Sequence, residues 1–204
     1  MTGLPLEIRE KIVQWLAAGE IELFIGYETG AVPLKATPAF VRRPEEVDRL
    51  IWDATCENNL AAFLPKYRGK KVGIMVKGCD SRAIIGLIQE GQFLRENLRI
   101  VGVSCAGVID PRRVAQKLAI PVEDVEDVTL SDGHVQVGDR PVAMDDAIYD
   151  LCRACIYHNP VVYDLHMGPE IAENPAVDPY ALAHEMMALS AEERWNRFEQ
   201  EVQR

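Results

Sequence analysis

The sequence predicts an α/β fold built on a parallel sheet, with a decorating β-hairpin and a proline-punctuated helical C-terminal tail. Two short apolar runs, 71–76 and 99–103, have the length and composition of buried strands, and the segment 80–94 between them has helical periodicity. A strand, a helix and a second strand in this order form a βαβ unit with parallel strands. With 204 residues, 48% of them hydrophobic, the chain can bury a full core.

The segments before this unit predict a helix, a hairpin and a second helix. Apolar residues recur at helical spacing from Leu6 to Ala18, ending near Gly19. The stretches 20–27 and 32–41 have extended character and enclose a short turn, which indicates a β-hairpin. Pro44 then opens a segment, 45–64, with helical spacing around Cys56 and a break expected at Asn58-Asn59.

The segments after the unit predict a further helix and hairpin. A helix is expected from Pro111 to Leu118, and a hairpin from 128–130 and 134–137 around the turn Ser131-Asp132-Gly133. The segment 145–151 has helical character and leads into Cys152.

The C-terminal tail is expected to be an appendage. It is punctuated by Pro160, Pro169, Pro175 and Pro179. A polar helix follows from Ala191, where Ser190 and Glu193 have the spacing of a capping box. We therefore expect a cysteine-rich, cluster-binding α/β domain over 1–165 and a helical appendage over 166–204.

The composition restricts the use of the cysteines. Five cysteines in a chain of this size form a poor disulfide framework. The N-terminus lacks the pattern of a secretory signal, and no stretch approaches the roughly 20 apolar residues of a membrane span, so we expect a cytoplasmic protein with reduced thiols. A formal charge of −10 argues against a nucleic-acid surface.

Four of these cysteines are predicted to meet at one edge of the sheet. Cys79 follows the first strand of the βαβ unit and Cys105 follows the second, and parallel strands end at the same edge. The pair Cys152 and Cys155 adds a CxxC motif. Four thiolates are the usual ligands of a 4Fe-4S cluster. We also expect the N-terminus of the following helix to stabilise a Cys79 thiolate.

Three other interpretations of the cysteines stay open. Each could be an ordinary buried residue, the four could form a structural zinc site that recruits partners, or Cys152 and Cys155 could act as a thiol-disulfide pair. A thioredoxin-like pair follows a strand directly, whereas Cys152 follows a helical segment, which favours the cluster. His158 could be a metal ligand or, more simply, a turn residue hydrogen-bonded to the backbone.

The residues after Cys79 are candidates for cofactor binding. Asp80, Ser81 and Arg82 are most simply a helix cap and its charged neighbour. At a helix N-terminus they could also hold an anionic group such as a phosphate. The sequence has no G-x-G-x-x-G motif for a dinucleotide.

The two strand ends carry a family resemblance. The segment Val72-Gly73-Ile74-Met75-Val76-Lys77-Gly78-Cys79-Asp80-Ser81-Arg82-Ala83, followed by Ile100-Val101-Gly102-Val103-Ser104-Cys105-Ala106-Gly107, resembles the beta subunits of deazaflavin-reducing (coenzyme F-420) hydrogenases and formate dehydrogenases. The Gly-Cys-Asp-Ser-Arg-Ala variant also resembles subunits that accompany heterodisulfide-reductase-like complexes. The resemblance covers about half of the chain, from Cys56 to Pro160.

The resemblance implies a role in electron transfer. It assigns Cys79, Cys105, Cys152 and Cys155 to a 4Fe-4S cluster, with FAD as a further candidate cofactor and other redox subunits as partners. Gly78-Cys79-Asp80 stands where the family more usually has Pro-Cys-Gln, and Cys56 is an additional thiol that could be a fifth ligand, a substitute ligand or inert. Relatives with the Cys-Asp-Ser-Arg-Ala sequence continue into a ferredoxin segment, so the chain could be truncated.

Overall fold

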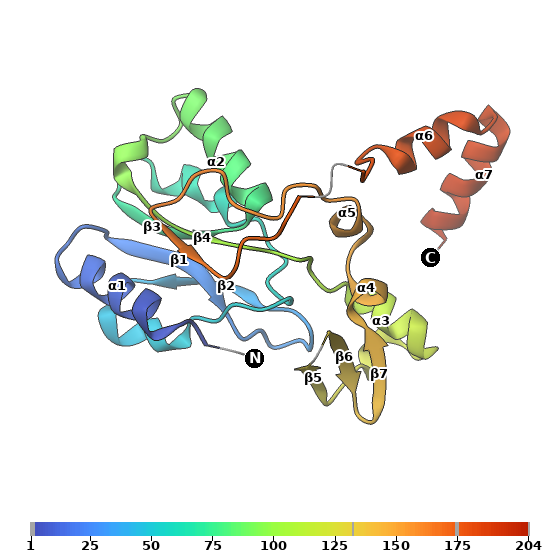
Figure 1. Ribbon diagram of the computed structural model, residues 1–204, viewed down its shortest axis with the longest axis horizontal. Helices are drawn as coiled ribbons and strands as arrows, with labels where there is room; N and C mark the ends of the chain where they lie inside the picture. The colour runs from blue at the N-terminus through green and yellow to red at the C-terminus, as the bar shows by residue number, and fades with distance from the viewer. Residues whose placement is uncertain (1–2, 132, 174–175, 204) are drawn as a thin grey trace.

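Two separate sheets organise the chain in the computed structural model, which describes residues 3–131, 133–173 and 176–203 (Figure 1). Asp132 of the predicted hairpin turn and Pro175 of the tail lie outside these residues. The larger sheet has five strands in the order β2-β1-β3-β4-β8, and the smaller has three in the order β5-β6-β7. The predicted α/β class is confirmed.

The five-stranded sheet is mostly parallel. Its strands are β1 (Leu23–Glu28), β2 (Thr37–Val41), β3 (Val72–Val76), β4 (Leu98–Val103) and β8 (Leu165–Met167). Strand β1 pairs with β2 in antiparallel fashion, as the predicted hairpin requires. The β1–β3, β3–β4 and β4–β8 pairs are parallel. All five residues of β3 are buried, which explains its continuous apolar sequence.

The helices cover both faces of this sheet. Helix α1 (Leu6–Ala17) buries Ile8, Ile12 and Trp15 beneath it, and α2 (Gly78–Gln89) crosses over it between β3 and β4 (Figure 1). The βαβ unit is therefore confirmed, with α2 beginning two residues earlier and ending five residues earlier than predicted. A short 3₁₀ helix, Arg95–Asn97, precedes β4.

The helical segment predicted over 45–64, with a break at Asn58-Asn59, is only partly correct: a helix does resume after Asn59, but the middle of the segment is not helical. The segment instead contains two 3₁₀ helices, Pro44–Arg49 and Leu60–Tyr67, separated by an irregular loop. Within the loop the Asp53 carboxylate accepts a hydrogen bond of 2.8 Å from the backbone N–H of Thr55, a local contact that competes with helix formation. The Asn59 side chain then caps the second 3₁₀ helix. Cys56 consequently lies in a loop.

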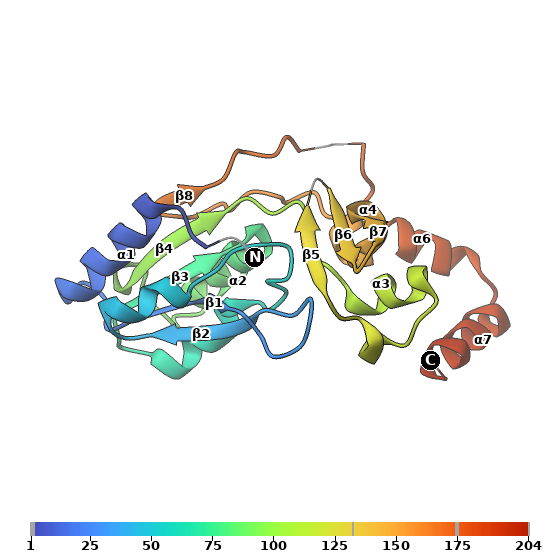
Figure 2. The same cartoon turned by 90° about the horizontal axis from the view of Figure 1, so that it is seen from below.

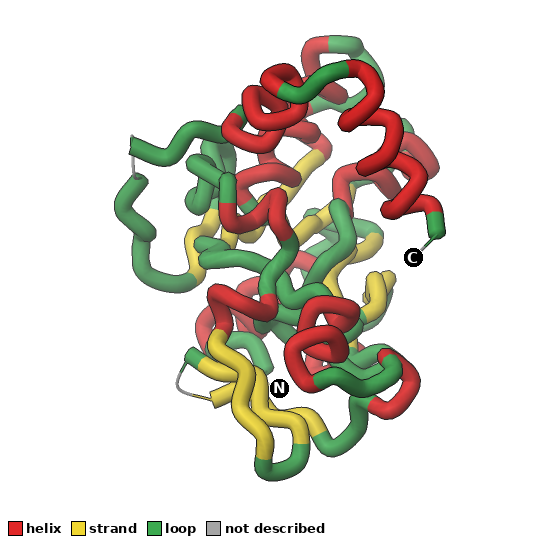
Figure 3. Tube along the Cα trace, turned by 90° about the vertical axis from the view of Figure 1, so that its right-hand side faces the viewer, coloured by secondary structure: helices red, strands yellow, loops and turns green. Residues whose placement is uncertain are grey.

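The smaller sheet forms a second core after β4. It contains β5 (Val128–Ser131), β6 (His134–Val137) and β7 (Arg140–Ala143), of which only the β5–β6 hairpin was predicted. Helix α3 (Pro111–Leu118) packs beside it with its predicted bounds, followed by a short 3₁₀ helix, Val122–Asp124. Figure 3 shows this small sheet at one end of the molecule.

Two short helices replace the segment predicted over 145–151. They are α4 (Met144–Ala147) and α5 (Asp150–Arg153). The break falls where the backbone turns back to the chain after β4: Ile148 forms a bridge with Ile109, and the Tyr149 N–H donates to the Val108 carbonyl. This contact fixes the direction in which α5 carries Cys152.

The tail contributes one strand and two helices. Strand β8 was not predicted, because three residues carry too little pattern to be recognised, yet it completes the parallel sheet beside β4. Helices α6 (Ala181–Ala188) and α7 (Ala191–Val202) extend away from both sheets and have no buried residue (Figure 2). The capping box of Ser190 and Glu193 is confirmed. Among the described residues, no helix is long and apolar enough to cross a membrane.

Candidate functional site

The ends of β3 and β4 bring Cys79 and Cys105 to one edge of the sheet, as predicted. The two strands are in register, with Val76 opposite Gly102, so the chain leaves both strands at the same level. Cys79 lies in the first turn of α2, and Cys105 lies two residues after β4. Cys152 on α5 and Cys155 just after it line the same small cavity. We call these four cysteines the thiol cluster.

Hydrogen bonds hold the loop after Cys155 against the end of β4. The backbone N–H of Cys105 donates to the His158 carbonyl at 2.9 Å, and His158 Nδ1 lies 2.9 Å from the Cys105 carbonyl oxygen. The Tyr157 N–H donates to Cys155 Sγ at 3.4 Å. His158 is therefore bonded to the backbone, as the simpler of its two predicted roles requires; it also lines the cavity of the four thiols, and its role as a metal ligand stays a prediction.

Gly78 lets this loop approach the start of α2. A Cβ atom at this position would lie 2.1 Å from the Tyr157 carbonyl oxygen and 2.9 Å from that of Asn159. Both are backbone atoms, so neither could move alone. The missing side chain thus allows the segment that carries Cys155 to pack directly on the segment that carries Cys79.

A second set of polar contacts fixes the same loop farther along. Ser81 Oγ donates to the Gly78 carbonyl at 2.8 Å and accepts from the Val161 N–H at 3.1 Å. Ser104 Oγ lies 3.1 Å from both Asn159 Oδ1 and His166 Nε2. These bonds connect α2, the end of β4 and β8 to the loop that follows Cys155.

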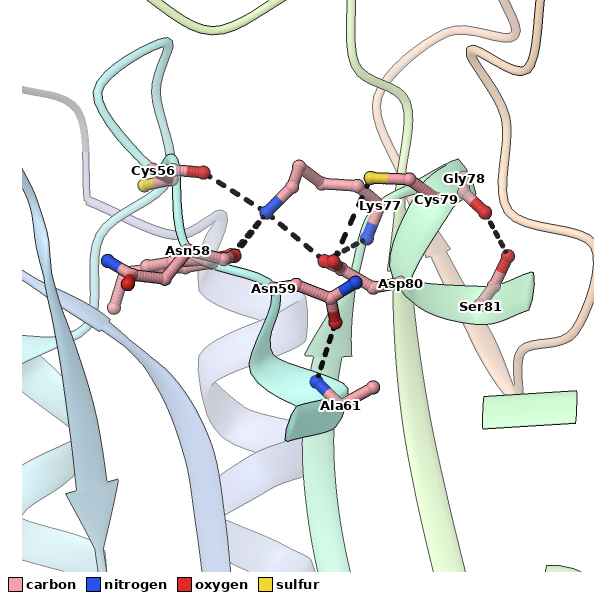
Figure 4. Close-up of polar contacts among 10 residues, drawn as sticks. Cys56, Asn58, Asn59, Ala61, Lys77, Gly78, Cys79, Asp80 and Ser81 are labelled. Atoms are coloured by element: carbon pink, nitrogen blue, oxygen red, sulfur yellow. Dashed lines mark hydrogen bonds and ion pairs between the residues drawn. The ribbon is translucent and has the colours of Figure 1, made fainter. Parts of the chain in front are cut away.

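A buried lysine lies directly beneath the thiol cluster. Lys77 is 2% exposed and lines the same cavity as the four thiols. Its ammonium group pairs with the carboxylate of Asp80 at 3.1 Å and donates to the carbonyl oxygens of Cys56 and Asn58 at 3.1 and 2.7 Å (Figure 4). It also donates to the hydroxyl of Tyr27, which in turn donates to the Asn58 carbonyl. The buried charge is therefore fully paired, as its burial requires.

Burial dominates the protonation of the thiols. It raises the pKa of Cys79 to about 11, with a further increase from Asp80, and that of Cys105 to about 12. It also raises the pKa of Cys152. The Lys77 ammonium opposes this effect at all three thiols. The backbone N–H of Asp80, at the helix start, does lower the pKa of Cys79 as predicted, but desolvation is the larger effect and the net pKa is raised.

The three residues predicted to hold a cofactor have partners within the chain. Asp80 is 0% exposed, and its carboxylate accepts from the Lys77 backbone N–H at 3.0 Å, which confirms its role as a helix cap. Ser81 makes the contacts described above, and the Arg82 guanidinium stacks 3.7 Å from the centre of the Tyr157 ring. Binding of a cofactor by Asp80, Ser81 and Arg82 stays a prediction.

Cys56 lies apart from the cavity lining. It is fully buried, and burial raises the pKa of its thiol to about 12. It contributes its backbone carbonyl to Lys77, while the cavity is lined by the other four cysteines. The geometry gives no support to Cys56 as a fifth or substitute ligand.

The spacing of the thiol cluster bears on what it can hold. Within residues 3–131, 133–173 and 176–203, no group of three or more His, Cys, Asp or Glu side chains is close enough to hold one metal ion. Four thiolates around a single zinc at 2.3 Å would stand about 4 Å apart. In a 4Fe-4S cluster each thiolate binds a different iron, so the sulfurs stand farther apart. The four thiols that line one cavity are the donor set that a 4Fe-4S cluster takes.

An apolar hollow of about 500 Å³ adjoins the thiol cluster. Val108, Tyr149 and Leu151 form much of its wall, beside Cys79, Cys152 and Cys155. Leu151, the second residue of α5, is 84% exposed. The size and the mostly apolar lining are typical of sites for small organic molecules.

Sequence reasoning missed Lys77, Tyr27 and the apolar hollow. Lys77 had a detectable signal, because a lysine directly after five buried apolar residues rarely lies free in solvent and must find partners. Tyr27 had no such signal, because it lies in a different strand, β1, and contacts Lys77 only because β1 and β3 are neighbours in the sheet.

Comparisons with known proteins agree with this fold. No protein-family model matches the sequence. The F420-dependent formate dehydrogenase 1 subunit beta of Methanococcus maripaludis is 25% identical over 116 residues, which are 55% of this chain and 30% of that protein. The chain is therefore a distant homologue of that subunit and spans less than a third of its length.

A solved structure has a similar fold. A chain of the xenon-derivatised F420-reducing NiFe hydrogenase complex from Methanosarcina barkeri superposes with a TM-score of 0.57 at 14% identity, over 74% of this chain and 59% of that chain. At this identity the likeness shows the fold alone. The association of the Gly-Cys-Asp-Ser-Arg-Ala variant with heterodisulfide-reductase-like complexes stays a prediction.

Proposed function

We propose that this chain is an electron-transfer subunit of an oxidoreductase, in which Cys79, Cys105, Cys152 and Cys155 hold a 4Fe-4S cluster. The observation that carries the proposal is the convergence of four thiols from three separate segments on one cavity. When bound, such a cluster takes up and releases one electron at a time. Distant homology to a formate dehydrogenase beta subunit supports the oxidoreductase class.

The protein's own residues would hold and enclose this centre. The thiol cluster supplies one ligand to each iron, and the hydrogen-bonded loop from Cys155 to Pro160 keeps the ligand segments in place. Cys105, Cys152 and Cys155 are partly buried, and backbone N–H groups at the start of α2 lie at the same edge of the sheet. A cytoplasmic location, where thiols stay reduced, belongs to the same proposal.

The apolar hollow is the proposed position of the exchange partner. FAD or a redox group of a partner subunit would lie against Val108, Tyr149 and Leu151, in direct neighbourhood of three of the thiols. Subunits of hydrogenase, formate dehydrogenase or heterodisulfide-reductase-like complexes are the proposed partners. The names of the two similar proteins support the first two.

The thiol-disulfide alternative is less favourable. A nucleophilic cysteine of that kind has a lowered pKa, whereas burial raises the pKa of Cys152. Cys152 also lies within α5 rather than directly after a strand. The zinc module requires a tighter group of ligands than the described residues form.

Metal analysis of anaerobically purified protein tests the proposal. We expect about four iron and four acid-labile sulfide per chain, as one 4Fe-4S cluster requires. Substituting serine for any one of Cys79, Cys105, Cys152 or Cys155 should reduce both contents together, whereas Cys56→Ser, the matched control, should retain them. A colourless wild-type protein without iron refutes the proposal; one zinc per chain without sulfide indicates the structural module instead.

A further inference from the structure

The Lys77–Asp80 pair is the feature of the molecule that the proposed function does not use. Both side chains are almost completely buried, at 2% and 0% exposure, although each carries a charge. A buried ion pair is weak evidence for stability, because desolvation offsets much of the attraction between the charges. Lys77 lines the cavity of the four thiols and Asp80 lies directly behind it, and this position indicates another use.

The two charges lie differently relative to the thiols. The carboxylate of Asp80 is next to one thiol: its Oδ1 is 3.8 Å from Cys79 Sγ. The ammonium of Lys77 lies on the other side of that carboxylate, among the carbonyl oxygens of Cys56 and Asn58 (Figure 4). Lys77 therefore lies in the cavity wall, and Asp80 lies behind the wall in contact with one thiol.

The ammonium cannot turn away from this position. It has three hydrogens and four oxygen neighbours, contributed by Tyr27, Cys56, Asn58 and Asp80. These neighbours come from β1, from the loop before the second 3₁₀ helix and from α2, so three parts of the fold together fix the position of Lys77 Nζ. A charge fixed in this way in a region with little water acts over a longer range than a surface charge.

We propose that Lys77 and Asp80 are positioning residues that set the reduction potential of the centre held by the thiol cluster, with opposite effects. This inference rests on the proposed function. Reduction adds one electron to the centre, so a nearby positive charge favours the reduced state and a nearby negative charge opposes it. Lys77 raises the potential and Asp80 lowers it.

A redox titration of the cluster-loaded full-length chain tests the inference. The electron is supplied by dithionite and removed by ferricyanide, and the reduced fraction is followed by electron paramagnetic resonance. We expect Lys77→Met to lower the midpoint potential and Asp80→Asn to raise it. Each shift should change the ratio of reduced to oxidised centre at least tenfold at a fixed potential, which is about 59 mV for a one-electron couple.

A matched control separates position from total charge. Lys70 precedes β3 at the opposite end of the strand and is exposed, paired with Glu22 at 2.9 Å. Lys70→Met removes the same charge as Lys77→Met but should leave the potential unchanged, because solvent and salt screen it.

The second variant keeps the test valid if the first does not fold. Lys77→Met leaves the Asp80 carboxylate buried without its cation, which can unfold the chain. Asp80→Asn has the same shape as the native side chain and can still accept from the Lys77 N–H, so it carries the test alone in that case. A wild-type chain without iron overturns both this inference and the proposed function, whereas a bound cluster with unchanged potentials in the variants, or with shifts of the same sign, overturns the inference only.

Discussion

Replacement of Gly78 by alanine should destabilise the protein, although alanine is normally the better residue in a helix. The new Cβ would lie 2.1 Å from the Tyr157 carbonyl oxygen and 2.9 Å from that of Asn159, well inside contact distance. Both oxygens belong to the loop that also bonds to β4, so relief requires movement of the backbone. Overpacking of this kind costs about 1–3 kcal/mol.

Gly86 provides a matched control within the same helix. A Cβ added at Gly86 meets no atom within 4 Å. Gly86→Ala should therefore stabilise α2 by about 0.5–1 kcal/mol, the usual gain in a helix interior. The two variants should differ by at least ~1.5 kcal/mol, which for a chain of this length corresponds to about 3 °C or more in Tm.

Thermal unfolding followed by circular dichroism measures this difference. Gly78→Ala should melt below the wild type and Gly86→Ala at or above it. Because the displaced loop carries Cys155, Gly78→Ala should also bind less iron than Gly86→Ala. Equal melting temperatures for the two variants would show that the loop does not pack on Gly78, and would refute the description of the site.

Two further predictions concern single side chains. In the metal-free folded protein, Cys56 should resist iodoacetamide because its side chain is fully buried, whereas Cys79 is exposed and should be labelled faster. Intact-mass spectrometry would count the labels, and five labels without denaturant would contradict the burial of Cys56. Glu46 accepts hydrogen bonds from the backbone N–H groups of Arg42 and Arg43, which with the Arg43 side chain lower its pKa to about 2 from 4.5. A lowered carboxylate pKa stabilises the folded state above pH 4.5, and this contribution is lost as the pH falls toward 2. Glu46→Gln should accordingly lower Tm at pH 7, with a difference from wild type that shrinks over this interval; a constant difference across the interval would contradict the lowered pKa.

The parts of the fold that the sequence predicts are those with strong local patterns. The run from Val72 to Val76, the helix after it and the run from Leu98 to Val103 each carry one clear periodicity, and parallel pairing follows from their order. The meeting of Cys79 with Cys105 is then a consequence of topology. Helix Pro111–Leu118 has its predicted bounds, and the structure shows why it begins there: Asp110 caps it and Pro111 is its first residue.

The parts that were missed depend on contacts distant in sequence. Strand β8 is three residues long and exists because β4 offers it a partner edge. The segment around Cys56 has helical spacing of apolar residues. However, the Ile51 N–H donates to the Tyr27 carbonyl and the Lys77 ammonium donates to the Cys56 carbonyl, so hydrogen bonds to the sheet determine the conformation of this loop. The network of Lys77 likewise combines residues up to 50 positions apart.

The second core has a mechanical consequence for the site. Its buried residues all lie between Ile109 and Ala147, apart from Leu34, and therefore within the stretch that joins Cys105 to Cys152. This stretch is folded on its own core, and its packing therefore fixes the distance between its two ends, which carry Cys105 and Cys152. If this second core unfolds locally while the five-stranded sheet stays intact, Cys152 and Cys155 lose their positions, whereas Cys79 and Cys105 keep theirs. The placement of Cys152 and Cys155 thus depends on the integrity of the smaller of the two cores.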